Sequence, residues 1–84
     1  MAERSPLHGA LGRAIRHVRV GRGISQEELG FRSGLHPTYV GGIERGERNP
    51  SYTSLMRLAD ALDVPLATLI TDAENPATPP TTSS

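Results

Sequence analysis

The three histidines are the side chains of this sequence best suited to bind a transition metal. His8, His17 and His36 are separated by nine and nineteen residues, and neither spacing forms a chelating pair. The chain contains no cysteine, so no thiolate can complete a metal site. We therefore expect no metal and no cofactor.

The hydroxyl and carboxylate side chains show no arrangement that performs catalysis. Serine and histidine are both present, but no strand-borne nucleophile and no pair of carboxylates in complementary roles accompanies them. The sequence therefore favours a binding protein over an enzyme.

Arginine supplies all nine basic residues, which balance nine acidic residues to a formal net charge of zero. Residues 1–24 contain five Arg and one Glu, whereas residues 49–84 contain one Arg and four acidic residues. Guanidinium groups bind phosphates and base edges well, but a preference for Arg can equally reflect genome composition. Charge alone neither predicts nor excludes a nucleic-acid partner.

The 84 residues are sufficient for one small domain. No apolar run approaches the roughly 20 residues that span a bilayer, and residues 1–11 lack the apolar core of a secretory signal, so we expect a cytoplasmic protein without membrane contacts. Residues 75–84 contain three prolines and no large apolar residue, which predicts a flexible tail. We assign a flexible N-terminus to residues 1–6, the folded domain to residues 7–73 and a disordered tail to residues 74–84.

Hydrophobic residues recur at helical spacing along the predicted domain. Two segments show the i, i+3, i+4, i+7 pattern of a helix with one buried face. They are Leu11, Ala14, Ile15 and Val18, and Leu55, Leu58, Ala59 and Leu62. A short fifth helix is expected from Pro65 to Thr71, and nothing shows the alternation of a strand. The sequence thus predicts an all-α fold, a compact five-helix bundle.

Two short helices are expected between those segments. Ser25 to Glu28 has the sequence of a capping box, in which the Ser25 hydroxyl accepts from the Glu28 amide and the Glu28 carboxylate returns to the Ser25 amide. Pro37 suits the first position of the next helix, predicted from Pro37 to Arg45, and Gly34 supplies a left-handed turn between them. Such a pair forms a helix-turn-helix unit. This spacing leaves open whether the unit binds DNA or is an ordinary crossing in a small bundle.

The amino-acid sequence of this segment resembles the phage-repressor/Cro, or Xre-type, helix-turn-helix family. The motif S-Q-x-x-L begins at Ser25, G-I-E-R-G begins at Gly42 and N-P-S begins at Asn49, in the family's order and spacing. The resemblance covers about residues 7–71 and is strongest to the small controllers of restriction–modification systems. It implies a bundle of the lambda-repressor-like DNA-binding type. It also implies a sequence-specific transcriptional regulator that binds double-stranded DNA as a homodimer on a (pseudo)palindromic operator.

The resemblance also implies which residues contact DNA. Ser25 and Gln26 begin the first helix of the unit, where a helix N-terminus favours phosphate, and Gln26 would also fix the recognition helix. The recognition helix and the loop after it would supply the other contacts. These are His36, Pro37, Thr38, Tyr39, Gly42, Arg48 and Asn49.

Two of these positions depart from the family's pattern. Pro37 and Gly42 carry no hydrogen-bonding group where related proteins often have amide or guanidinium readers, so bidentate base contacts are missing there. Instead of contacting DNA, the Tyr39 ring could be half-buried on the flank of the helix. We therefore expect modest direct readout, a larger share from DNA shape, and Arg48 as the strongest single anchor.

Two further interactions follow from the resemblance. Arg19 and Glu44 would form a partly buried ion pair that fixes the recognition helix. A dimer interface would be built from Leu66, Leu69 and Ile70. No small-molecule ligand is expected, and a DNA-bound regulator would be associated with the nucleoid. The alternative is an antitoxin-like or adaptor module that contacts another protein, which the zero net charge and weak base readers also fit.

Overall fold

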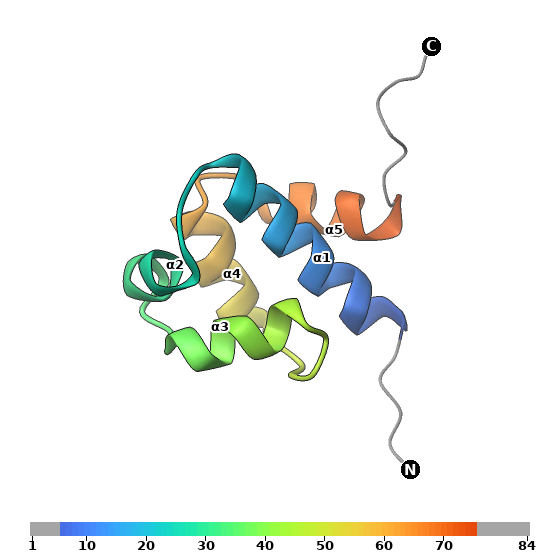
Figure 1. Cartoon of the computed structure of the whole chain (residues 1–84). Coiled ribbons are helices and arrows are strands. Elements are labelled where there is room, and N and C mark those ends of the chain that lie inside the picture. Colours follow the sequence, from blue (N-terminus) through green and yellow to red (C-terminus); the bar gives the residue numbers. More distant parts are fainter. Residues whose placement is uncertain (1–5, 76–84) are drawn as a thin grey trace.

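The structure is a computed structural model that describes residues 6–75. Within these residues the chain forms five helices and no strand. They are α1 (Pro6–Gly21), α2 (Gln26–Ser33), α3 (Pro37–Glu44), α4 (Tyr52–Ala61) and α5 (Leu66–Glu74). α2 and α3 lie together on one side of α1 and α5 lies on the other (Figure 1). The predicted all-α fold is confirmed.

The predicted domain limits differ slightly from the helix ends. Pro6 and Glu74, which were assigned to the flexible ends, lie within α1 and α5. Asn75, also assigned to the tail, is the C-cap of α5, and its backbone N–H donates to the carbonyl oxygen of Thr71 at 2.8 Å. The remaining residues of the predicted flexible ends, 1–5 and 76–84, lie outside the described residues.

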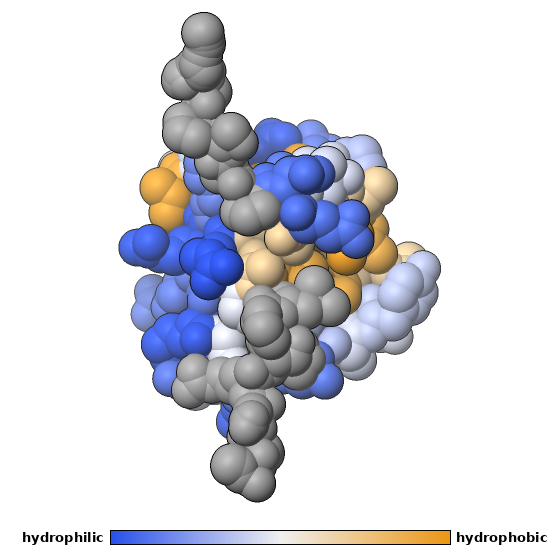
Figure 2. Space-filling view, turned by 90° about the vertical axis from the view of Figure 1, so that its right-hand side faces the viewer, coloured by the Kyte–Doolittle hydropathy of each residue, from blue (hydrophilic) through white to orange (hydrophobic). Residues whose placement is uncertain are grey.

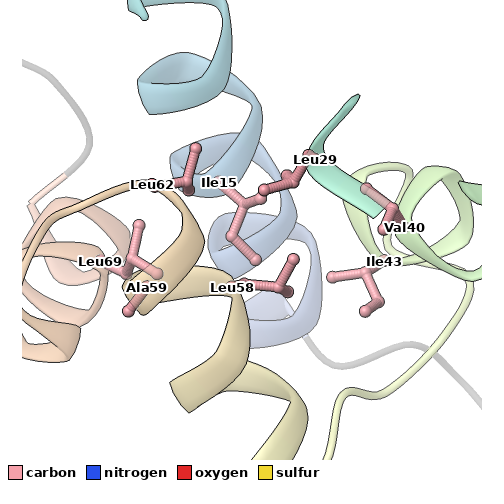
Figure 3. Packing of buried hydrophobic residues seen from close by; sticks show 8 residues of the cluster. All are labelled: Ile15, Leu29, Val40, Ile43, Leu58, Ala59, Leu62 and Leu69. Atoms are coloured by element: carbon pink, nitrogen blue, oxygen red, sulfur yellow. The ribbon is translucent and has the colours of Figure 1, made fainter. Parts of the chain in front are cut away.

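One cluster of buried side chains joins all five helices. Both predicted hydrophobic stripes contribute to it, together with single residues from α2 and α5 and a pair from α3 (Figure 3). Its members are Ile15, Leu29, Val40, Ile43, Leu58, Ala59, Leu62 and Leu69. Because α3 buries its inner face here, the core sets the position of α3, the predicted recognition helix.

A second, smaller cluster explains why α5 is longer than predicted. Leu11 and Ala14 of α1 pack with Ala73 of α5, and all three are buried. The expected end at Thr71 is corrected to Glu74, because burial of Ala73 against α1 favours one more helical turn.

The predicted capping box at the start of α2 is only half formed. The Ser25 hydroxyl accepts from the Glu28 backbone N–H at 2.9 Å, as predicted. The Glu28 carboxylate instead accepts from Arg32 Nε at 2.7 Å, one turn along the same helix. An i, i+4 ion pair on the exposed face has thus replaced the reciprocal capping bond.

Candidate nucleic-acid interface

A left-handed glycine turn joins α2 to α3. Gly34 caps α2 with a φ of +76°, which glycine adopts at low cost. Gly30 faces the chain that enters α3, and a Cβ there would lie 2.7 Å from the carbonyl oxygen of Leu35 and 3.2 Å from Pro37 Cγ. The close approach of the two helices therefore requires a glycine at position 30.

An imidazole caps the start of α3. Nδ1 of His36 accepts a hydrogen bond from the backbone N–H of Thr38 at 3.0 Å, which satisfies one of the free donors of the first turn. Since Nδ1 is the acceptor, Nε2–H remains free to donate. His36 and Thr38 are exposed, whereas Pro37 is partly buried against Gly30. The entrance to α3 thus presents an imidazole and a hydroxyl to solvent.

The carboxylate of Glu44 joins α3 to α1. Arg19 donates to it twice, from Nε at 2.7 Å and from Nη2 at 3.1 Å, and both side chains are buried. A third donor of Arg19, Nη1, lies 2.9 Å from the carbonyl oxygen of Ile24 in the loop before α2. The structure therefore brings together the two residues expected to pair, in the bidentate geometry that gives strong charge-assisted hydrogen bonds.

Gln26, the first residue of α2, contacts the same carboxylate. Its Nε2 donates to Glu44 Oε1 at 2.9 Å, and its side chain is partly buried. This contact corresponds to the expected fixing of the recognition helix, whereas a contact of Gln26 with the DNA backbone stays a prediction. Ser25 is exposed and caps α2. One carboxylate thus positions α3 against both α1 and α2.

Tyr39 lies on the flank of α3. Its ring is partly buried against the central cluster, and its hydroxyl lies 3.3 Å from Ser54 Oγ on α4. This placement corresponds to the alternative of a half-buried ring. The guanidinium carbon of Arg48 lies 6.0 Å from the ring centroid, so the ring still borders the predicted interface.

Gly42 is buried, and the loop after α3 covers it. A Cβ on Gly42 would lie 2.5 Å from Cγ of Arg48. This corrects the expectation that position 42 faces base edges, because the aliphatic stem of Arg48 occupies the space in front of it. Arg48 and Asn49 are exposed, as an interface requires.

The sequence pattern did not identify Gly12, where α1 approaches the end of α3 closely. A Cβ on Gly12 would clash with the carbonyl oxygen of Ile43 and lie 2.6 Å from that of Glu44. The available signal was a glycine in the middle of a helix, a position where it costs about 1 kcal/mol relative to alanine. Gly12 thus allows the end of α3, with Glu44, to come within reach of Arg19.

The helix-turn-helix family matches residues 15–69. The chain belongs to the helix-turn-helix family. Control protein C.SmaI of Serratia marcescens is 43% identical over 61 residues, 73% of either protein. Control protein C.BamHI of Bacillus amyloliquefaciens is 41% identical over 54 residues, 63% of this chain and 67% of that protein. The crystal structure of the restriction-modification controller protein C.AhdI from Aeromonas hydrophila matches with a TM-score of 0.72 and 46% identity, over 73% of this chain and 92% of that one. The predicted resemblance to Xre-type controllers is confirmed.

In this helix-turn-helix protein the three residues predicted at a dimer interface have different surroundings. Leu69 is 0% exposed within its own chain, so it is not available to a partner, which corrects that part of the prediction. Leu66 and Ile70 flank it on the helix and are only partly buried, at the edges of the two clusters. Hydrophobic surface gathers on the side of the molecule where α1 and α5 lie (Figure 2).

Among the described side chains, which do not include His8, no group of three or more His, Asp or Glu could hold a metal ion. Over residues 6–75 no helix has the length and apolar character needed to cross a bilayer.

Proposed function

We propose that this helix-turn-helix protein is a sequence-specific transcriptional regulator that inserts α3 into the major groove of DNA. The observation that best supports this proposal is that α3 is buried on one side, whereas its start and the loop after it are exposed to solvent. Val40 and Ile43 are buried in the core, whereas Thr38, Arg48 and Asn49 are exposed at the entrance of the helix and in the loop after it. A recognition helix docks in this way, with its back packed on the bundle and its first residues directed at base edges.

The start of α2 supplies the contacts to the DNA backbone in this proposal. Ser25 is exposed beside the free N–H groups of the first turn, where the positive end of the helix dipole favours a phosphate. Nε2 of Gln26 uses one of its two hydrogens on Glu44 and has the second for a phosphate oxygen. Binding at this position fixes the register of α3 without reading sequence.

The regulator is proposed to act as a homodimer, because one short recognition helix makes too few contacts for specific binding. A two-fold dimer matches an operator with half-sites about 34 Å apart, one turn of DNA. Leu66 and Ile70 are the proposed contacts; both belong to α5, the helix that lies on the side of α1 away from α3 (Figure 1). Dimerisation coupled to DNA binding would make protein concentration the regulatory signal. In this proposal the protein is not an enzyme, and it is associated with the nucleoid in the cytoplasm.

Measurement of affinity for duplex DNA against salt concentration tests the proposal. The expected result is a linear fall of log K with log salt, with a slope of about −0.9 for each phosphate neutralised. Weak binding with no salt dependence would contradict phosphate contacts and with them this function.

One observation favours the second candidate, a module that contacts another protein. Phe31 on α2 is 83% exposed, more than any other large hydrophobic residue among those described. Exposed aromatic residues are frequent anchors in protein interfaces. The same salt titration separates the candidates, since only the DNA-binding function predicts a steep slope.

A further inference from the structure

α3 has no side chain at the position where Gly42 lies. Every residue from Val40 to Glu44 is buried, and two of the five are glycines. After Thr38 and the flank residue Tyr39, α3 therefore offers no side chain of its own to a base edge until its C-cap, Arg45. The guanidinium of Arg45 is engaged with Glu47, Nε to Oε1 at 3.1 Å.

The loop after α3 folds back over this gap. The backbone N–H groups of Glu47 and Arg48 both donate to the carbonyl oxygen of Gly42, at 2.8 and 3.2 Å. Gly46 permits the turn with a φ of +77°. The stem of Arg48 then crosses Gly42, so that a Cβ there would lie 2.5 Å from Cγ and 3.7 Å from Cδ of Arg48. This contact involves the base of the side chain, which cannot move aside as easily as its far end.

The guanidinium of Arg48 lies near the Tyr39 ring, and its N–H donors are not used in other contacts of the described residues. It lies 6.0 Å from the centroid of Tyr39, and the Tyr39 hydroxyl is held near Ser54 of α4. Over residues 6–75 the guanidinium takes part in no ion pair or hydrogen bond, in contrast to those of Arg19, Arg32 and Arg45. Its five N–H donors are therefore available to a ligand.

We propose that Gly42 is a positioning residue, which gives the Arg48 stem a path across α3 so that this guanidinium reads a base in place of the missing side chain. The ligand chemistry is a guanine in the major groove, whose O6 and N7 accept two parallel hydrogen bonds from a guanidinium. The inference rests on the proposed function and extends it from the fold to one specificity contact. The recognition surface then consists of α3 and the loop that covers it.

A double-mutant cycle tests the coupling of Gly42 to Arg48. The unaltered chain, Gly42→Ala, Arg48→Ala and the double variant are measured for melting temperature and for affinity to the operator. Affinity is also measured for operators with single base-pair substitutions. Gly21→Ala is the matched control, because it adds the same methyl group to a helix with nothing within 4 Å.

The expected result is that Gly42→Ala and Arg48→Ala each weaken operator binding by about 10-fold or more and that the double variant is no weaker than Arg48→Ala alone. Both single variants should lose discrimination at the same G·C pair, and Gly21→Ala should bind as the unaltered chain does. The inference would be overturned if the fold-losses in operator affinity of the two single variants multiplied in the double variant. It would also be overturned if Gly42→Ala bound the operator normally. Undiminished binding by Arg48→Ala would overturn it as well.

Two outcomes separate the inference from its premises. If the unaltered chain bound no duplex, the proposed function itself would be refuted, whereas binding without the coupling refutes only the inference. If Gly42→Ala failed to fold, removal of the Arg48 stem in the double variant should restore the melting transition. A double variant that stayed unfolded would overturn the inference, because the clash would then not involve Arg48.

Discussion

Arg19 and Glu44 are 25 residues apart in sequence and form a bidentate ion pair in which their side chains are 11% and 2% exposed. Both charges are largely removed from water, so each depends on the other for compensation. The same guanidinium reaches the carbonyl oxygen of Ile24 before α2. One side chain of α1 thus positions both helices of the helix-turn-helix unit.

Arg19→Ala should lower the free energy of unfolding by about 3–5 kcal/mol, because the buried Glu44 charge would retain only the Gln26 amide. It should also weaken DNA binding, since α3 would lose its attachment to α1. Arg16→Ala, an exposed residue of the same helix, is the control and should change stability by less than about 0.5 kcal/mol. Denaturant unfolding measures both, and equal stability of the two variants would contradict the buried pair.

Gly9 and Gly12, both in the first half of α1, should respond in opposite directions to the same substitution. Gly9→Ala should stabilise the protein by up to about 1 kcal/mol, because its Cβ would meet only the far end of Arg13 at 3.4 Å. Gly12→Ala should destabilise it by about 1–3 kcal/mol, because its Cβ would meet the backbone of Ile43 and Glu44. Thermal melting compares them, and a Gly12→Ala variant as stable as Gly9→Ala would show that α1 and α3 are not so close.

The His36 cap should be replaceable by another cap but not by alanine. His36→Ala should lose about 1 kcal/mol of stability, because the Thr38 N–H loses its acceptor. His36→Asn should retain most of it, since asparagine is among the best N-cap residues. Stability is the readout here, as His36 is also predicted to lie beside DNA. If His36→Asn were as unstable as His36→Ala, the capping role would be wrong.

Adjacent residues of α5 should separate folding from association. Ile70→Asp should leave a folded chain that sediments as a monomer, because Ile70 is only partly buried at the edge of a cluster. Leu69→Asp should unfold the chain, since that side chain is 0% exposed and an unpaired carboxylate is costly to bury. Sedimentation with circular dichroism distinguishes these results, and dimers of Ile70→Asp would place the interface elsewhere.

Local signals predicted most of the fold. Hydrophobic spacing located the stripes of α1 and α4, and the Ser25 hydroxyl and Pro37 marked the starts of α2 and α3. These features act within one or two turns of helix, so they can be recognised from neighbouring residues. The end of α5 was missed because burial of Ala73 depends on α1, some 60 residues away.

The candidate site was less predictable, because its details depend on contacts between elements. The resemblance to the family predicted the Arg19–Glu44 pair, but it did not predict that Gln26 donates to the same carboxylate. The resemblance also placed Gly42 toward DNA, whereas the fold of the next loop puts Arg48 over it. A glycine in a sequence does not reveal which backbone or side chain approaches it.

Selection of binding sites from random duplexes tests the central claim most directly, that α3 reads DNA with the support of Gln26 and Arg48. We predict enrichment of a two-fold symmetric site with half-sites about 34 Å apart. A folded variant with Gln26→Ala and Arg48→Ala should bind that site about 100-fold more weakly or worse. The absence of any enriched sequence, or unchanged affinity in the folded double variant, would contradict the account.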